Sequence, residues 1–337
     1  MIDASRGHQN SELVETIKAK IERNGIALLT NADLYSPEDL RPWADSLFDE
    51  QADYVGGTNK RKNLGKGILN VGTEPPHADI WDHNEKSYWS SYMDRIMFGC
   101  VQAPKTPAPT SVADNAAVTL ELEGTTTATK IKEHQIRYIR NFHDIDAPWL
   151  RSADGKVLTS DNGTPIPECR GEADLRSVKS WQEAFNVENR EQMLEYAKKH
   201  GLSLEWLEFK RLRVYYILPG YELDSQGNDH FFLSLGNHGL SMDKWAEMAH
   251  PNMVDRPFHF QYGNGEEFSD EDIEIIHAAF AKYRVAIQWE NGLIAILDNV
   301  RWTHARLAYT LFLGDKRILG VALGNPVKDR RLRLDEH

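Results

Sequence analysis

Residues 83–88 read His-Asn-Glu-Lys-Ser-Tyr, and residues 304–306 read His-Ala-Arg. In an extended segment the side chains of residues i and i+2 project to the same side, so His83 and Glu85 are expected to point together. With His304 from a distant part of the chain, they make a set of two imidazoles and one carboxylate. Such a set on one face of a metal leaves coordination positions open, as in non-heme Fe(II) oxygenases. The two stretches therefore predict a catalytic iron site.

The spacing of the first motif is weak evidence when it is taken alone. A chain with 13 histidines and 51 acidic residues contains several His-x-acid pairs by chance. A surface histidine beside a solvated acid is the common alternative. His77-Ala78-Asp79 has the same spacing just upstream, so spacing does not choose between the two pairs. The surrounding sequence has to decide which histidine binds the metal.

Composition limits the class of protein and its partners. A chain of 337 residues with 41% hydrophobic content can bury a large core, and β-rich enzymes of this length are often a single domain. We therefore expect a single domain over residues 1–337. The formal charge of −12 argues against a nucleic acid or an anionic membrane as partner. A small molecule, either free or tethered to a carrier protein, is the expected partner, and the oligomeric state is left open.

The sequence also carries information about location and thiol chemistry. No apolar run approaches the roughly 20 residues of a membrane span, and the N-terminus lacks the basic-then-apolar order of a signal peptide. We therefore expect a cytoplasmic protein. Cys100 and Cys169 are too few for a disulfide framework or a zinc cluster. Four downstream histidines match no standard zinc signature: His230, His238, His250 and His259.

Apolar periodicity and capping signals predict a mixture of helices and strands. A helical stripe over 11–24 stops at Gly25 and is followed by a buried strand at 26–29. Ser269-Asp270-Glu271-Asp272 has the form of a capping box and starts another helix. Residues 143–179 are polar and lack periodicity, which is typical of an insertion or lid. Further helices are expected at 36–48, 181–185 and 190–200, and strands at 96–100, 134–142, 212–217, 287–289, 293–297, around His304 and at 317–323.

Two more stretches extend the first motif in a specific order. Ile96-Met97-Phe98-Gly99-Cys100 and Pro109-Thr110-Ser111-Val112-Ala113-Asp114 follow residues 83–88. Together they resemble the taurine-dioxygenase-like (TauD/SyrP, clavaminate synthase-like) family of Fe(II)/2-oxoglutarate-dependent oxygenases. Its members read roughly H-x-E/D-x-S-Y, an apolar strand ending in Cys, and G-G-x-T-x-x-x-D. The similarity covers about residues 65 to 324, continuing through 138–141, 180–185, 204–206, 260–265, 298–299, 304–306 and 314–319.

The resemblance implies a fold, a ligand set and a reaction. The fold is mainly β with flanking helices, a double-stranded β-helix or jelly roll of the cupin type. The implied iron ligands are His83, Glu85 and His304, which leaves His77 and Asp79 outside the ligand set. The reaction uses O2 and 2-oxoglutarate to hydroxylate an unactivated C–H bond, and desaturation or cyclisation would use the same ligands. Because a carboxylate is present at position 85, halogenation is not expected.

The co-substrate brings its own charge requirement. 2-Oxoglutarate binds iron through its C1 carboxylate and keto oxygen, so its far carboxylate needs a fixed cation, and a guanidinium offers two parallel hydrogen bonds. Arg317 is the first candidate, because it begins the strand after that of His304 and a hairpin would place the two strands side by side. Arg306 is the alternative, because it faces the same side as His304. Thr110 matches the family's motif threonine, which implies a hydroxyl donor to the same carboxylate.

The substrate is the least constrained part of the prediction. Asn84 and Tyr88 flank the metal motif, and their position alone suggests contact with the substrate. Family members act on sulfonates, carnitine precursors, free amino acids and carrier-tethered residues, often in natural-product pathways, and we expect a small amino-acid-like substrate. Ala108-Pro109 replaces the family's Gly-Gly, and His230-Phe231-Phe232 replaces its Trp-Phe-Asn segment. Two alternatives stay open: a non-catalytic β-helix binding or sensor protein, and a metal dioxygenase that needs no 2-oxoglutarate.

Overall fold

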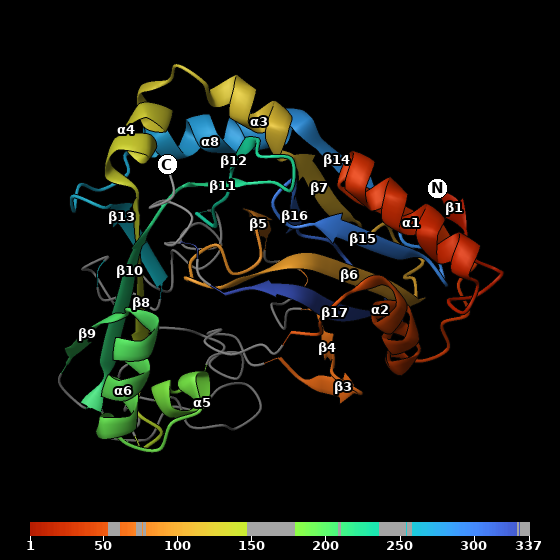
Figure 1. The fold of residues 1–337 in the computed structure, drawn as a ribbon, viewed down its shortest axis with the longest axis horizontal. Coiled ribbons are helices and arrows are strands. Elements are labelled where there is room, and N and C mark those ends of the chain that lie inside the picture. Colours follow the sequence, from red (N-terminus) through yellow and green to blue (C-terminus); the bar gives the residue numbers. More distant parts are fainter. Residues whose placement is uncertain are drawn as a thin grey trace.

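The computed structural model describes residues 1–52, 61–71, 76, 79–146, 179–207, 210–235, 254, 258–328 and 330. Most of the predicted insertion at 143–179 lies outside these ranges, and so does His77. Four sheets with helices on their flanks make up the described part of the chain (Figure 1). The expected mainly β fold with flanking helices is therefore confirmed. Among the described helices, none has both the length and the apolar character that a membrane span requires.

The largest sheet packs against helices on one face and against a smaller sheet on the other. Its seven strands run in the order β1-β2-β15-β6-β17-β4-β3. The alternation of side chains along β6 divides the core, because Met97 packs with the helices on one face while Ile96 and Phe98 point to the other. The strands are β1 (Ile2–Asp3), β2 (Ile26–Thr30), β3 (Asn63–Gly65), β4 (Ile68–Asn70), β6 (Tyr92–Gln102), β15 (Ile294–Asp298) and β17 (Ile318–Val327).

A four-strand sheet packs against that second face and carries the site. Its order is β14-β7-β16-β5, with β14 (Arg284–Ile287), β7 (Thr110–Asp114), β16 (Trp302–Arg306) and β5 (Ile80–His83). Val112 of β7 and Ile287 of β14 share one apolar cluster with Phe98, Ala295 and Val321 of the large sheet. The two sheets thus bury a common core, and β16 lies between β7 and β5 in the smaller sheet.

The remaining elements form a second core around another sheet. Its order is β13-β8-β10-β9, and helices lie at both ends of it (Figure 1). The strands are β8 (Ile136–Phe142), β9 (Ser203–Trp206), β10 (Leu212–Leu218) and β13 (Phe258–Tyr262), with a separate pair β11 (Tyr221–Leu223) and β12 (Asp229–Phe231). The helices are α3 (Asn115–Leu122), α4 (Thr126–His134), α5 (Trp181–Phe185), α6 (Arg190–His200) and α8 (Asp270–Tyr283).

Local signals account for most helix boundaries. Helix α1 (Ser11–Asn24) begins where Asn10 accepts from the Leu13 N–H, and it ends at Gly25, whose φ of 68° is left-handed. Ser269 and Asp272 make the predicted capping box of α8. The single helix expected over 36–48 is wrong in one respect: a 3-10 turn, η1 (Pro37–Leu40), precedes α2 (Arg41–Leu47). The proline ring at residue 42 has no N–H to continue the earlier turn. Helix α4 was not predicted.

Gly292 provides a test of how closely the N-terminal segment packs on the large sheet. Its φ is 77°, and a Cβ there would lie 2.4 Å from the backbone oxygen of Ala32. Gly7 has the same φ of 77° with nothing within 4 Å, so it is a matched control for backbone strain. We expect Gly7→Ala to lose about 1 kcal/mol of unfolding free energy. Gly292→Ala should lose about 2–4 kcal/mol, because the clash adds to the strain. Urea unfolding measures both, and equal losses would contradict this packing.

Candidate metal centre

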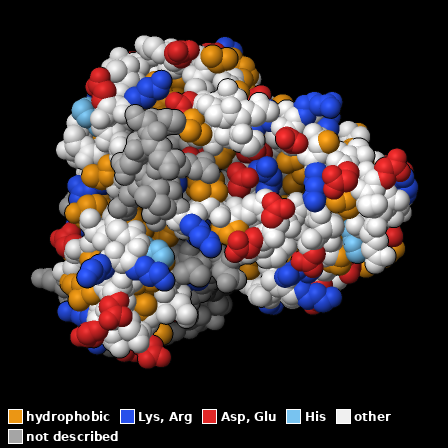
Figure 2. Space-filling model, viewed as in Figure 1, with side chains coloured by type: hydrophobic (Ala, Val, Ile, Leu, Met, Phe, Trp, Pro, Cys, Tyr) orange, Lys and Arg blue, Asp and Glu red, His pale blue; other side chains and the backbone are white. Residues whose placement is uncertain are grey.

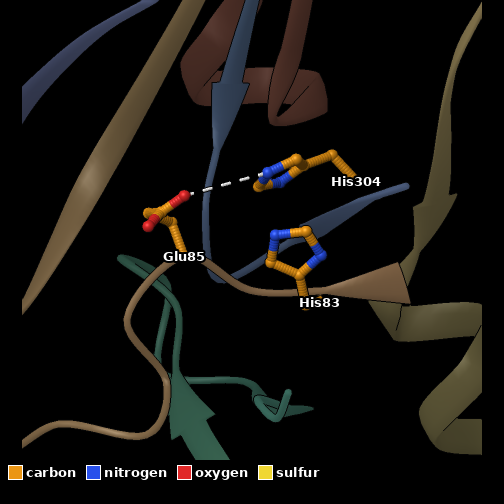
Figure 3. Close-up of side chains that lie close together, drawn as sticks. All are labelled: His83, Glu85 and His304. Atoms are coloured by element: carbon orange, nitrogen blue, oxygen red, sulfur yellow. Dashed lines mark ion pairs between the residues drawn. The ribbon is translucent and has the colours of Figure 1, made fainter. Parts of the chain in front are cut away.

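His83, Glu85 and His304 converge, although they come from two distant parts of the chain. One potential ligand atom from each lies within 4.8 Å of the others (Figure 3). His83 ends β5 and is the register partner of His304 in β16, so the sheet itself brings the two rings to a centroid distance of 4.2 Å. The Glu85 Oε2 atom lies 4.0 Å from the His304 Nε2 atom.

Glu85 reaches the site from a turn and not from the strand. Strand β5 ends at His83, and residues 85–88 form a turn. The expected i, i+2 alternation of an extended segment is therefore not what orients this carboxylate. Its backbone is held instead by Asn299, whose Oδ1 accepts from the Glu85 N–H at 2.8 Å and whose Nδ2 donates to the Glu85 carbonyl at 3.0 Å. Asn299 is fully buried, so this contact is shielded from water.

Asn84 reinforces the same connection. Its Nδ2 donates to the Asn299 carbonyl at 2.6 Å, and its Oδ1 accepts from the Leu233 N–H at 3.0 Å. Both ends of this fully buried amide are thus used inside the fold. Contact of Asn84 with a substrate stays a prediction. The turn bearing Glu85 is joined by these amides to the segment that leads into β16 and His304.

Each imidazole has a feature that suits it to bind a metal. The His83 Nδ1 atom lies 2.7 Å from the Trp81 carbonyl, and because a carbonyl only accepts, Nδ1 carries a hydrogen and Nε2 is the nitrogen that is left to bind a metal. Burial, together with nearby His83 and Arg61, holds the pKa of His304 well below its ordinary value. A neutral imidazole at position 304 is the state that ligates a metal.

Arg61 is a functional candidate that sequence reasoning missed. Its Nη2 donates to the Glu85 Oε2 atom at 3.0 Å, and the two side chains are 12% and 4% exposed. The same Oε2 atom faces the His304 Nε2 atom, so the guanidinium fixes the orientation of the carboxylate at the site. Arg61 lies in an irregular segment without a motif, so no local pattern pointed to it.

A second polar cluster contains Arg317 and Thr110. The Arg317 Nη2 donates to the Thr110 Oγ1 atom at 3.0 Å, and the Arg317 Nε donates to the Ala108 carbonyl at 3.0 Å. The Trp289 Nε1 also donates to Thr110 Oγ1, at 3.1 Å. Because that oxygen already accepts two N–H groups, its own hydrogen is left to donate to a further acceptor. Burial lowers the pKa of Arg317 to about 10, which keeps the guanidinium charged at neutral pH.

Arg317 reaches Thr110 by a route that differs from the expected one. The predicted hairpin between the strands of His304 and Arg317 is wrong, because β16 pairs with β7 and β5 while β17 pairs with β6 and β4 in the large sheet. The chain between them crosses from one sheet to the other.

Arg306 and Arg317 both lie against the Tyr309 ring, at 5.5 Å and 5.7 Å from its centroid.

The other sequence candidates occupy defined positions. Asp79, which belongs to the alternative pair His77 and Asp79, accepts from the Ala308 N–H at 2.6 Å. This carboxylate therefore anchors a loop. Tyr88 lies under the Arg140 guanidinium, with 4.0 Å between the ring centroid and Cζ, and its contact with a substrate stays a prediction. Between them, Lys86 has a φ of 59° and a side chain only 3% exposed. Burial lowers the pKa of Lys86 to about 8, although Glu85 favours its charged form.

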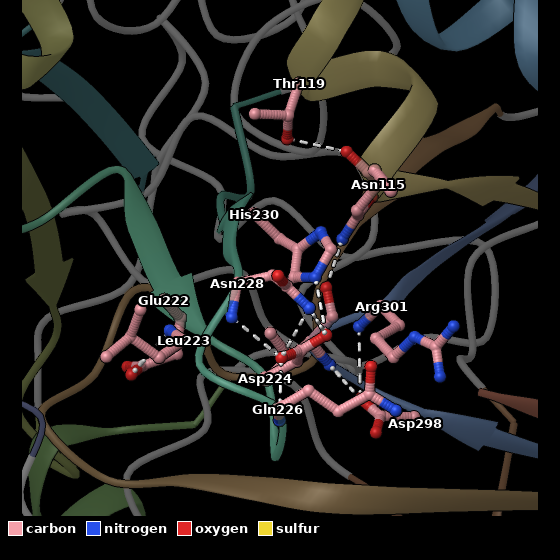
Figure 4. A network of polar contacts seen from close by, with 12 residues as sticks. Asn115, Thr119, Glu222, Leu223, Asp224, Gln226, Asn228, His230, Asp298 and Arg301 are labelled. Atoms are coloured by element: carbon pink, nitrogen blue, oxygen red, sulfur yellow. Dashed lines mark hydrogen bonds and ion pairs between the residues drawn. The ribbon is translucent and has the colours of Figure 1, made fainter. Parts of the chain in front are cut away.

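Two of the four downstream histidines pair with acids. The His230 Nε2 atom lies 2.9 Å from Asp224 Oδ2, within the polar network at the β11–β12 turn (Figure 4). Burial alone would raise the pKa of Asp224, but hydrogen bonds from His230 and Asn228 hold it at about 2. The His259 Nε2 atom lies 2.9 Å from Glu267. His238 and His250 lie outside the described residues.

Comparison with known proteins places the chain in a family. The family model for taurine catabolism dioxygenase TauD and the TfdA family matches residues 3–195. The chain is 25% identical over 315 residues to the dapdiamide synthesis protein DdaC of Enterobacter agglomerans, covering 91% of this chain and 84% of DdaC. It is 19% identical over 289 residues to a clavaminate synthase-like protein of Arabidopsis thaliana, covering 85% and 78%.

Solved structures are also similar to the chain. A taurine dioxygenase from Burkholderia xenovorans aligns with a TM-score of 0.49 and 12% identity, covering 97% of this chain and 85% of that one. The family match spans more than half of the sequence and confirms the family expected from the motifs. The protein therefore belongs to the TauD/TfdA family of dioxygenases.

Proposed function

We propose that the protein is an Fe(II)- and 2-oxoglutarate-dependent oxygenase that hydroxylates an unactivated C–H bond of a small amino-acid-like substrate. The observation that carries this proposal is the convergence of His83, Glu85 and His304 in a member of a dioxygenase family. The same ligands would also serve desaturation or cyclisation. We take the chain as one oxygenase domain with a jelly-roll arrangement of its two packed sheets, acting in the cytoplasm.

The three converging residues fit Fe(II). Two neutral imidazole nitrogens and one carboxylate oxygen are the donor set of a facial triad, which leaves positions for co-substrate and O2. Fe(II) held by these residues would supply O2 activation coupled to the decarboxylation of 2-oxoglutarate to succinate. The protein's own contribution is orientation: the Trp81 carbonyl sets the His83 ring, and Arg61 holds one oxygen of Glu85. Burial of Glu85 and His304 keeps bulk water away from the ligands.

Arg317 and Thr110 are proposed to bind the far carboxylate of 2-oxoglutarate. The guanidinium and the hydroxyl already lie 3.0 Å apart, so both can donate to one anion without rearrangement. Trp289 supports the pair by donating to the same hydroxyl oxygen. Arg306 shares the Tyr309 ring with Arg317, and no described contact joins it to Thr110, so it is the weaker candidate.

The proposed substrate class rests on the family and on charge. DdaC is named for dapdiamide synthesis, and this supports a biosynthetic role for the present protein as well. On the face drawn in Figure 2, acidic and basic side chains are interspersed without a broad cationic area. With a net charge of −12, this favours a small molecule, free or on a carrier protein, over a nucleic acid.

Anaerobic addition of Fe(II) and 2-oxoglutarate tests the metal site. The intact site should give a weak visible metal-to-ligand charge-transfer band, and His304→Ala should abolish it because one ligand is lost. His134→Ala, at the end of α4, is the control and should keep the band. Absence of the band in the unmodified protein would favour the non-catalytic binding or sensor alternative.

Replacement of the two arginines tests the co-substrate site. Arg317→Met should raise the KM for 2-oxoglutarate by about 10- to 100-fold, since charge-assisted hydrogen bonds are worth about 1.5–3 kcal/mol. Arg306→Met should change that KM less, and Arg301→Met, whose side chain bonds to α1 carbonyls, should leave it unchanged. The readout is succinate formation at varied 2-oxoglutarate. Full activity of Arg317→Met without 2-oxoglutarate would point to the dioxygenase alternative that needs no co-substrate.

A panel of amino acids tests the substrate class. Iron-loaded protein is incubated with 2-oxoglutarate, O2 and each amino acid, and succinate is followed by mass spectrometry. At least one amino acid should stimulate succinate formation above the substrate-free rate and gain the mass of one oxygen atom. A broad panel without stimulation would exclude free amino acids as the substrate class.

A further inference from the structure

Lys86 is a buried cation without an ionic partner in the described part of the chain. Its side chain is 3% exposed. Glu85 is the acidic side chain that acts on its ammonium, and among the described residues no hydrogen bond or ion pair joins the two. A charged group that loses most of its contact with water without gaining a partner is unfavourable. Such a group is often retained where it serves a ligand, so Lys86 is a candidate for binding an anionic ligand.

Glu85 does not supply the missing charge. Its Oε2 atom already accepts from Arg61 at 3.0 Å, and the proposed iron would share the same carboxylate. The charges of Arg61 and Lys86 thus both act on one carboxylate before a metal would add positive charge of its own. The C1 carboxylate of 2-oxoglutarate offsets only part of this excess, because the far carboxylate is matched to Arg317. A further anion beside the iron would restore the balance.

The backbone holds Lys86 in a strained position. A φ of 59° is uncommon for a residue with a side chain, and such strain concentrates at functional sites. The turn is fixed on both sides, because the Ser87 N–H donates to the Asn84 carbonyl at 3.2 Å and the Trp89 N–H donates to the Lys86 carbonyl at 3.0 Å. The buried Arg330 also donates to the Ser87 carbonyl, at 2.6 Å. The backbone of Lys86 is therefore fixed in the turn next to Glu85.

Lys66 shows that left-handed backbone alone does not bury a lysine. Its φ is 48°, similar to that of Lys86, yet its side chain is 64% exposed and its ammonium lies 3.8 Å from Glu38. The two lysines share residue type and backbone region but differ in burial and in the presence of an acidic partner. Lys66 is thus a matched control for Lys86.

We propose that Lys86 binds a carboxylate of the substrate and so determines substrate specificity. This inference rests on the proposed function and names the substrate class of that same site: an amino-acid-like molecule whose carboxylate is free. An amino acid joined to a carrier through its own carboxyl group would lack this anion. The positive charge of the lysine would hold the substrate carboxylate beside the proposed iron ligands. The substrate would then bind in one orientation, with the same C–H bond facing the metal site.

The test compares Lys86→Met with Lys66→Met. First, free amino acids and their amides are added to the anaerobic Fe(II)/2-oxoglutarate complex, and perturbation of the visible band reports binding. The unmodified protein should respond to at least one acid and more weakly to its amide. Lys86→Met should keep the band, weaken binding of that acid by about 10- to 100-fold and leave amide binding unchanged. Lys66→Met should match the unmodified protein.

Stability and co-substrate affinity provide independent readouts. Because Lys86→Met removes an unpaired buried charge, its thermal midpoint without metal should equal or exceed that of the unmodified protein. A lower midpoint would assign Lys86 a structural role and overturn the inference. A changed 2-oxoglutarate KM with unchanged acid binding would also overturn it, as would a panel in which no acid perturbs the band. Absence of the band itself in the unmodified protein would instead refute the proposed function.

Discussion

Asn299 makes the contact on which the candidate metal centre depends. Its side-chain amide hydrogen-bonds both backbone groups of Glu85, and its Nδ2 also donates to the Met93 carbonyl at 2.8 Å. One buried side chain thus connects the turn of the first motif, strand β6 and the segment that leads to His304. Replacing a buried amide that satisfies several backbone groups leaves all of them without partners, which is costly. The convergence of distant ligands is therefore maintained by a neutral residue that would not itself bind the metal.

The sheets supply the other half of the geometry. Strand pairing places His83 opposite His304, and the shared core between the two sheets holds β5, β7 and β16 against β6 and β17. Thr110 begins β7 and Arg317 immediately precedes β17, so the proposed co-substrate site lies where the two sheets meet. The proposed iron ligands and the proposed co-substrate ligands are thus positioned by the same core. A single packed scaffold can hold both with little reorganisation during the reaction.

Local sequence signals and the order of the motifs predicted the main helices and the family. They did not predict which distant strands pair with each other. Helices α1 and α8 followed from their caps and apolar stripes, and the ordered motifs identified the family. The hairpin expected between His304 and Arg317 was wrong, because consecutive strands can join different sheets and no local pattern encodes that choice. Arg61 was missed because its partner is distant in sequence and its segment carries no motif. The role of Asn299 could have been suspected from the Asp298-Asn299 match, but its contact with Glu85 required coordinates.

The central claim is that His83, Glu85 and His304 form the iron site while the equally spaced upstream pair does not. Crystals grown without oxygen in the presence of Fe(II) would locate the metal by anomalous scattering at the iron edge. The account predicts one strong peak within bonding distance of a ring nitrogen of each of the two histidines and an oxygen of Glu85. A peak bound by His77 and Asp79, or a metal that leaves Glu85 uncoordinated, would contradict it.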